Sequence, residues 1–241
     1  MTNAAMPSNW STTAINLPDH ADNTIHTDAG ARAAGFPAAL VAGTSIYAYL
    51  THPPAAAWGL DWLTHGGGEL HLRQPVFDGD TIECAVTTTD DGEPLVSACV
   101  EGDAKSSLRL WKHAAAPALR DGDALQPVTT RLVDAHIDYA LRCGDDLDIY
   151  AQHRIAHPVT WAQLANQVFI DNLVTGPWIH VRSKIFHEAV APLGADVRVE
   201  SNLLDRFASR AGERALVDMR IYANDEPVAT IEHEAIIVLA S

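Results

Sequence analysis

Residues 20–28 read His-Ala-Asp-Asn-Thr-Ile-His-Thr-Asp, and residues 144–150 read Gly-Asp-Asp-Leu-Asp-Ile-Tyr. When Ile25 is placed on Ile149, the two stretches align as altered copies of one motif. Their separation is about half of the 241-residue chain, which indicates an internal repeat. We therefore expect two halves that share one order of elements.

The two copies of the motif have lost different residues. The first copy keeps Asn23 and His26, but it has Ala21 where the second copy has Asp145. The second copy keeps that acid and has Tyr150 in place of the histidine. A site that needs both the acid and the histidine is therefore incomplete in each half.

Composition and charge exclude several classes of function. The net charge of -15 argues against binding to nucleic acid or to an anionic membrane, since either needs clustered Lys and Arg. No stretch approaches the roughly 20 apolar residues of a membrane span. Met1–Pro18 lacks the pattern of a signal peptide. Cys84, Cys99 and Cys143 are odd in number and in no metal or redox spacing, so we expect a cytoplasmic protein with reduced thiols.

Helical patterns follow the first motif. A short helix is expected over Thr27–Ala34, capped by Thr27 or Asp28. Val41–Leu50 is apolar almost all round, which predicts a buried helix. Pro53 and Pro54 are expected to interrupt it before a second helical stretch. Residues 1–14 are polar and Ala-rich and are expected to be loosely ordered.

The period of the pattern then changes to two, which is typical of strands. In the first half, strands are expected at Glu69–Val76, Thr81–Thr89, Pro94–Val100 and Lys105–His113. Ala114–Gln126 reads as a linker between domains expected at 1–120 and 127–241. In the second half, helices are expected at Ala135–Arg142 and Pro158–Ile170, and strands at Trp178–Phe186, Ala195–Asp205, Ala215–Ala223 and Val228–Leu239.

Each half is thus an α+β unit with one central helix and four antiparallel strands. A helix that is apolar all round needs a curved sheet wrapped about it. Two such sheets protect their edges best by pairing into one continuous sheet.

These elements and motifs resemble those of the MaoC-like dehydratases and (R)-specific enoyl-CoA hydratases, which have a double hotdog fold. The family signature is Gly-Asp-x-Asn-Pro-Ile-His, then a short helix, Ala-x-Gly-Phe, and a Val-x-Gly turn into the central helix. The matching stretches here are Asn23–His26, Ala34–Phe36, Val41–Gly43, Arg73–Asp80 and Tyr139–Asp145. The resemblance implies two antiparallel sheets, each wrapped around a central helix and joined into one continuous sheet.

The resemblance also implies an activity, the reversible addition of water to an enoyl thioester of CoA or of a carrier protein, without a cofactor. His26 would be the acid/base, and the Gly43 N–H at the start of the central helix would donate to the thioester oxygen. Asn23 would order the loop. Thr44 and Tyr47 would contact the substrate, with Tyr47 lining the acyl tunnel.

The departure from the family lies at the catalytic acid, because Ala21 occupies its position. Asp22 lies one residue closer to His26 than Ala21 does. It either substitutes for the missing acid or is a solvated turn residue. Loss of one proton-transfer group typically lowers a rate by about 10²–10⁴-fold. Asp145 and Tyr150 are the candidates of the second half, and the family fold places them at a separate site from His26.

Other polar residues receive simpler interpretations. His20, Asp22, His26 and Asp28 match no zinc spacing, so no metal is expected. The remaining charged clusters lie in two predicted strands. His180, Arg182 and Lys184 should share one strand face, which is either solvated or in contact with CoA phosphates, and Glu232 and Glu234 should be exposed.

The sequence therefore favours a hydratase or dehydratase of acyl thioesters. The absent acid at Ala21 leaves open a hotdog thioesterase, isomerase or cyclase, and the damage to both motifs leaves open a non-catalytic acyl-binding subunit. The expected partner is an acyl-CoA or acyl-carrier protein. Because the two halves already form a pseudo-dimer, the chain could be a monomer or a homodimer.

Overall fold

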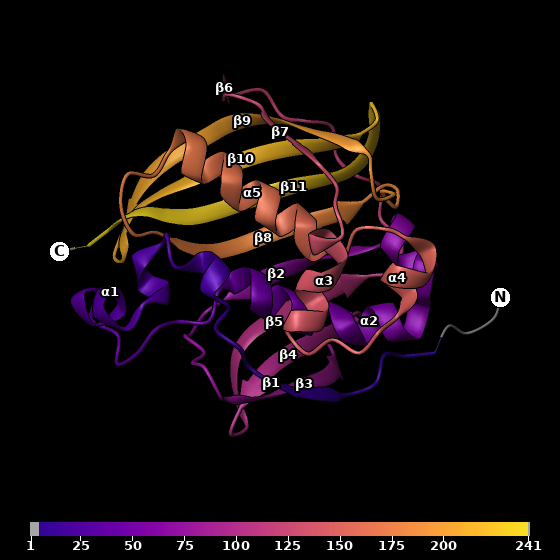
Figure 1. Ribbon diagram of the computed structural model, residues 1–241, viewed down its shortest axis with the longest axis horizontal. Coiled ribbons are helices and arrows are strands. Elements are labelled where there is room, and N and C mark those ends of the chain that lie inside the picture. The colour runs from indigo at the N-terminus through magenta and orange to yellow at the C-terminus, as the bar shows by residue number, and fades with distance from the viewer. Residues whose placement is uncertain (1–4, 241) are drawn as a thin grey trace.

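The computed structural model describes residues 5–240. Their strands form one antiparallel sheet of eleven strands, in the order β1-β3-β4-β5-β2-β8-β11-β10-β9-β6, with β7 also paired to β9 (Figure 1). The strands of the first half are β1 (Trp10–Thr13), β2 (Gly67–Leu72), β3 (Thr81–Thr88), β4 (Pro94–Val100) and β5 (Asp103–Trp111). Those of the second half are β6 (Asp123–Ala124), β7 (Val128–Arg131), β8 (Ile179–His187), β9 (Asp196–Ser209), β10 (Gly212–Ala223) and β11 (Glu226–Leu239).

Two long helices supply the centres of the two halves. α2 (Gly43–His65) packs on the sheet of the first half, and α5 (Val159–Asn172) packs on that of the second (Figure 1). The shorter helices are η1 (Pro18–His20), η2 (Thr24–His26), α1 (Asp28–Ala33), α3 (Ala135–Arg142) and α4 (Ile149–His153). This is the predicted α+β arrangement, with two curved antiparallel sheets joined into one.

The two halves repeat one plan in detail. An isolated bridge joins Leu40, just before α2, to Phe77 between β2 and β3. A second bridge joins Ile155, just before α5, to Pro192 between β8 and β9. The approach to each central helix is thus held at the same place relative to its sheet.

The seam between the halves is the antiparallel pair β2 and β8. Gly67 opposes Phe186 there, and Leu70 opposes Ser183. At Gly67 the backbone has φ of 147°, and an added Cβ would lie 2.0 Å from the Ile185 carbonyl oxygen. Because the two backbones approach so closely, the seam requires glycine at this position.

The helix α2 does not stop at its two prolines, contrary to the expectation. It continues through Pro53 and Pro54 and kinks only at Gly59, where φ is 55°. Pro53 has no N–H to give to the Tyr49 carbonyl. The buried Cys84 thiol lies 3.3 Å from that carbonyl oxygen and donates to it, so the oxygen keeps a partner.

The N-terminal segment is more ordered than expected. Residues 1–4 lie outside the described part of the chain, but Trp10–Thr13 forms the edge strand β1 against β3. The stretch read as a linker is also anchored. The backbone N–H and guanidinium of Arg120 both donate to the buried carboxylate of Asp218. Within residues 5–240, no helix is both long and apolar enough to cross a membrane.

Candidate functional site

A cavity of about 540 Å³ lies where the first turn of α2 faces the start of β8 and one side of α5. Residues from both halves form its walls. They include His20, Asp22, Asn23, His26, Gly43 and His180. The first five come from the first half, and His180 comes from the second.

His26 is held in one orientation at the end of η2. Its Nδ1 lies 2.8 Å from the Leu40 carbonyl oxygen, and it must donate because a carbonyl only accepts. In the neutral ring, Nε2 therefore carries a lone pair and is the nitrogen left for a ligand. Burial lowers the pKa of His26, although the bond to Leu40 partly offsets this effect. At neutral pH, His26 is thus a proton acceptor on the cavity wall.

Asn23 joins the loop of the first half to the second half. Its side-chain N–H donates to the Trp178 carbonyl oxygen at 2.9 Å. Its Oδ1 is buried and has no hydrogen-bond partner among the described residues. The contact fixes the position of the loop that carries His26.

Gly43 begins α2 beside the same cavity. The preceding residue, Ala42, has no polar side chain to cap the helix, so the first N–H groups of α2 are left without side-chain acceptors. A Cβ added to Gly43 would lie 2.5 Å from Leu72 Cδ1 and 3.3 Å from His180 Nδ1. Glycine therefore allows Leu72 and the imidazole of His180 to approach the amino end of this 23-residue helix closely.

A hydrogen-bonded group connects this helix to the second half. The Tyr139 hydroxyl lies 2.7 Å from His20 Nε2, 2.8 Å from Ser45 Oγ and 3.1 Å from Thr44 Oγ1. Burial, followed by the nearby His26, lowers the pKa of His20 to about 4. The rings of His20 and His26 are 5.6 Å apart, so the cavity holds two neutral imidazoles side by side.

The acids near His26 differ in their surroundings. Asp22 lines the cavity and is exposed, and no hydrogen bond to its carboxylate occurs within residues 5–240. Asp19 also lines the cavity, but Arg142 holds it through bonds of 2.9 and 2.7 Å. The hydrogen bond from Arg142 lowers the pKa of Asp19. Asp22 is therefore the acid of this loop that remains unengaged in the described structure.

The other substrate-contact predictions have mixed outcomes. Thr44 lines the cavity as expected. Tyr47 does not line it, contrary to the expectation, because its side chain points into the core and is fully buried. Burial also raises the pKa of Tyr47 far above its ordinary value.

The second-half candidates lie away from this cavity. Asp145 is buried with Oδ2 3.4 Å from His157 Nε2 and Oδ1 3.9 Å from His52 Nε2. The Tyr150 ring packs 4.4 Å from that of His157. Asp145 and His26 thus belong to different places, as the repeat implies.

His180 faces inward, and the expectation that it shares a face with Arg182 is wrong. In the pairing of β8 with β11, Arg182 opposes Glu234 and His180 opposes Ala235, so Val181 is an extra residue. Such a bulge reverses the side-chain alternation. His180 is therefore 6% exposed and reaches the cavity, while Arg182 stays on the outer face.

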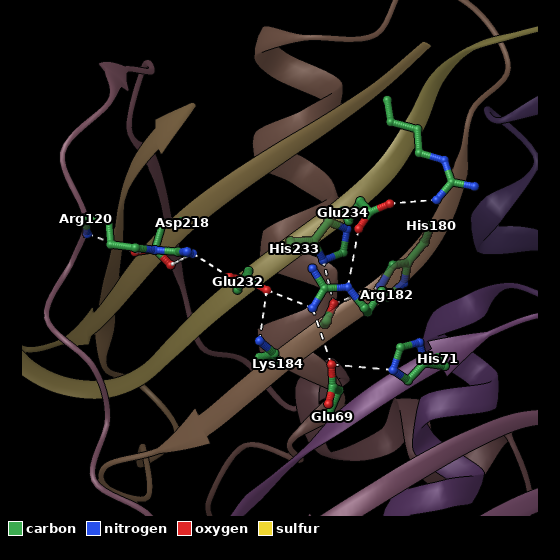
Figure 2. Close-up of polar contacts among 12 residues, drawn as sticks. Glu69, His71, Arg120, His180, Arg182, Lys184, Asp218, Glu232, His233 and Glu234 are labelled. Atoms are coloured by element: carbon green, nitrogen blue, oxygen red, sulfur yellow. Dashed lines mark hydrogen bonds and ion pairs between the residues drawn. The ribbon is translucent and has the colours of Figure 1, made fainter. Parts of the chain in front are cut away.

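The outer face at the seam carries a network of ion pairs (Figure 2). Arg182 lies within 3.4 Å of carboxylate oxygens of Glu69, Glu232 and Glu234. The side chains of Glu232 and Glu234 are only 13% and 12% exposed, so they are less accessible than expected. Burial alone would raise the pKa of Glu232, but the bond from Arg120 and the charge of Arg182 outweigh it and the pKa is lowered.

Two groups of His and acidic residues in the described chain bring ligand atoms within 4.8 Å of one another. They are Asp61, His65 and His113, and His52, Asp145 and Asp146. Neither group borders the cavity around His26. The imidazoles of the cavity are instead engaged by a carbonyl or by hydroxyl groups.

The chain matches no protein-family model and no curated protein sequence. Solved structures do resemble it. A protein named MaoC-like dehydratase has a TM-score of 0.62 at 14% identity, over 98% of this chain and 99% of that one. A conserved Mycobacterium tuberculosis protein described as a double hotdog fold has a TM-score of 0.63 at 13% identity, over 96% of each chain. A proposed oleoyl thioesterase from Lactobacillus plantarum has a TM-score of 0.55 at 9% identity, over 99% of each chain. At these identities the likeness shows the fold, which is a double hotdog.

Proposed function

We propose that this double hotdog protein catalyses the reversible addition of water to the double bond of an enoyl thioester. One observation carries the proposal. His26 has its Nδ1–H fixed by the Leu40 carbonyl, which leaves Nε2 as a base in the cavity that also holds the first turn of α2 at Gly43. Hydration of an enoyl thioester needs a base for the water and hydrogen-bond donors for the thioester oxygen. The cavity holds both, as His26 Nε2 and the N–H groups at the start of α2.

The reaction follows from these positions. His26 Nε2 takes a proton from water, and the water oxygen forms a bond to the β-carbon as the carbon–carbon π bond breaks. The electron pair moves onto the thioester oxygen, where the Gly43 N–H stabilises the enolate. The His26 imidazolium then gives up its proton through Asp22, which delivers a proton to the α-carbon, so both side chains return to their starting state. The dehydration direction reverses each step.

Asp22 is the proposed second acid/base group. It is the unengaged carboxylate on the cavity wall, whereas Asp19 is paired with Arg142. Its exposure allows it to exchange protons with solvent between turnovers. His20 is the imidazole beside His26 in the cavity, but its Nε2 is already bonded to Tyr139. The Asp22→Asn variant should therefore slow turnover more than His20→Asn does.

The central test is His26→Asn, assayed by hydration of crotonyl-CoA to 3-hydroxybutyryl-CoA. Asparagine can keep the bond to the Leu40 carbonyl through its amide but has no base at the position of Nε2. We expect kcat to fall by about 10²–10⁴-fold, as is typical when a proton-transfer group is lost.

His71→Asn is the matched control, because His71 is a partly exposed histidine on the outer face beside Glu69. Its turnover should equal that of the unchanged protein. Equal turnover by His26→Asn would remove His26 from the mechanism.

A thioesterase is the second candidate. It is favoured by the exposed Asp22 carboxylate, which could direct water at the thioester carbonyl, and by the fold shared with a proposed oleoyl thioesterase. Product analysis separates the reactions. Hydration consumes the enoyl group and releases no thiol, hydrolysis releases free CoA, and an isomerase or cyclase does neither. Saturable binding without any product would indicate an acyl-binding subunit.

A further inference from the structure

We infer that His180, which comes from the second half, is a second hydrogen-bond donor to the thioester oxygen beside the Gly43 N–H. The inference rests on the proposed function, since it assigns a residue to the same reaction. The proposed site would then contain functional residues from both halves, although only the first half carries the histidine motif.

The placement of His180 is the first support. The side chain is more than nine-tenths buried and borders the cavity. Its Nδ1 has no hydrogen-bond partner among residues 5–240. That atom lies 3.3 Å from the position a Cβ on Gly43 would take, so it faces the first turn of α2. A ligand oxygen at this helix end would therefore meet two nitrogen atoms.

The hydrogen bonds behind the ring determine which nitrogen carries the proton. Ser183 Oγ lies 2.8 Å from His180 Nε2 and 2.8 Å from His233 Nδ1. A serine hydroxyl has one proton, so it donates to one imidazole and accepts from the other. If His180 donated to it, His233 would have to hold its own proton on Nε2, which is buried without a partner.

The alternative moves the unpaired N–H to His180, which borders the cavity, whereas His233 does not. His233 donates from Nδ1 to Ser183, and Ser183 donates to His180 Nε2. His180 then holds its proton on Nδ1, facing Gly43, where a ligand oxygen accepts it. Buried N–H groups rarely lack an acceptor, and only at His180 can a ligand in the cavity supply one, which favours this arrangement. Within it, Ser183 and His233 are positioning residues.

The imidazole acts here as a neutral donor and not as an acid. Burial lowers the pKa of His180 to about 3, and the stacked ring of His233 is 4.1 Å away. The positive end of the α2 dipole further disfavours an imidazolium. A neutral imidazole can still polarise a carbonyl through its N–H. Its bond strengthens as charge develops on the oxygen, so its loss should appear in kcat more than in KM.

Three variants test the inference in the crotonyl-CoA assay. His180→Leu removes the donor and should lower kcat by about 10²–10³-fold with little change in KM, as loss of one such donor does. His180→Asn places an amide N–H near the position of Nδ1 and should recover a measurable part of that loss. His187→Asn is the matched control, because His187 is equally buried on β8 but borders no part of the cavity. It should leave kcat unchanged.

A spectroscopic readout separates a donor from a structural role. The carbonyl carbon of bound [1-¹³C]butyryl-CoA, which cannot be hydrated, should shift downfield relative to free ligand in the unchanged protein and in His187→Asn. His180→Leu should lose much of that shift while still binding. The pH profile of His180→Asn should keep the midpoint of the unchanged protein, because His180 does not titrate in the assayed range.

The outcomes distinguish the two proposals. Normal hydration with an unaltered kcat and carbonyl shift in folded His180→Leu overturns the role of His180 and leaves the function standing. Binding of butyryl-CoA with a His180-dependent shift, but no hydration, supports the role and rejects the hydratase. Failure of every acyl-CoA to bind rejects both, because His180 would then have no carbonyl to polarise.

Discussion

At the scale of single residues, one hydrogen bond orients His26 for its proposed role. The Leu40 carbonyl accepts from Nδ1, so the basic nitrogen can only be Nε2. The Leu40 N–H in turn donates to the Ile25 carbonyl at 3.0 Å, which ties the histidine loop to the entrance of α2. The orientation of the base is thus set by backbone that lies next to the proposed electrophile.

The ionisation of His26 gives a signed prediction for the effect of pH. Burial lowers its pKa below the ordinary 6.5, and a base works in its neutral form. The kcat/KM for crotonyl-CoA should therefore rise as pH increases through the pKa, with a midpoint below 6.5. The His71→Asn variant should give the same curve. A midpoint above 6.5, or a rate that rises toward acid pH, contradicts His26 as the base.

The sequence predicted that three residues from nearby segments of the first half act together, and their roles stay predictions. Asn23, His26 and Gly43 do border one cavity. It did not predict His20 with Tyr139, or His180, because these contacts join segments more than 100 residues apart. Tyr47 does not border this cavity, since periodicity shows that a helix is buried all round but not which side faces a cavity.

At the scale of elements, tertiary contacts overrode two expectations from local sequence, one about prolines in a helix and one about side-chain alternation in a strand. Two prolines in α2 were expected to interrupt the helix, but the Cys84 thiol of a neighbouring strand supplies the donor that one proline lacks. Strict alternation along β8 was expected, but Val181 is an extra residue. In both elements the conformation depends on a residue or strand from another segment, so the local sequence pattern could not predict it.

The start of α2 can be tested by Gly43→Ala. Its added Cβ would lie 2.5 Å from the end of the Leu72 side chain and 3.3 Å from His180 Nδ1. The Leu72 side chain can move, and the backbone is helical, so stability should change little. The methyl group displaces Leu72 and His180 beside the proposed site of the thioester oxygen, and kcat/KM should fall by about 10²-fold, as small misplacements in a site do.

Gly176→Ala is the control for this substitution, because nothing lies within 4 Å of its added Cβ. Thermal unfolding and crotonyl-CoA turnover would be measured for both variants. A Gly43→Ala protein with full activity would show that this helix end does not hold the reacting group.

At the scale of the whole molecule, the inner and outer surfaces of the sheet at the seam between β2 and β8 differ in what they hold. The inner surface holds the cavity that both halves line. The outer surface holds the ion pairs in which Arg182 links Glu69 of β2 to Glu232 and Glu234 of β11 (Figure 2). Two helix-centred halves joined into one sheet were predicted from the repeat and from edge protection, and the resemblance to MaoC-like dehydratases implied the double hotdog fold. The ion network was not, because it depends on the register across the seam.

Removal of Arg182 should weaken the whole fold. In Arg182→Met, three largely buried carboxylates lose a cation, and the free energy of unfolding should fall by about 2 kcal/mol. Lys184→Met is the control, since Lys184 is 39% exposed and 3.5 Å from Glu232, and it should cost less than about 1 kcal/mol. Urea unfolding followed by circular dichroism measures both, and equal values would contradict a special role for Arg182.

The same network has a defined pH dependence. The pKa of Glu232 is lowered in the folded state, so its stabilisation is complete above its ordinary pKa of 4.5 and is lost as pH falls below that value. The difference in unfolding free energy between Arg182→Met and the unchanged protein should therefore shrink as the buffer is taken below 4.5. A difference that is constant with pH would point to packing in place of charge.

The extra residue in β8 changes how this chain aligns with others. A gap-free alignment of β8 with a regular strand that matches Arg182 onward puts His180 in an outward-facing column. A sequence profile would then compare His180 with outward-facing residues of its relatives, although its side chain points inward. Relatives that share this donor are better sought by superposing backbones, with residue 181 allowed as an insertion.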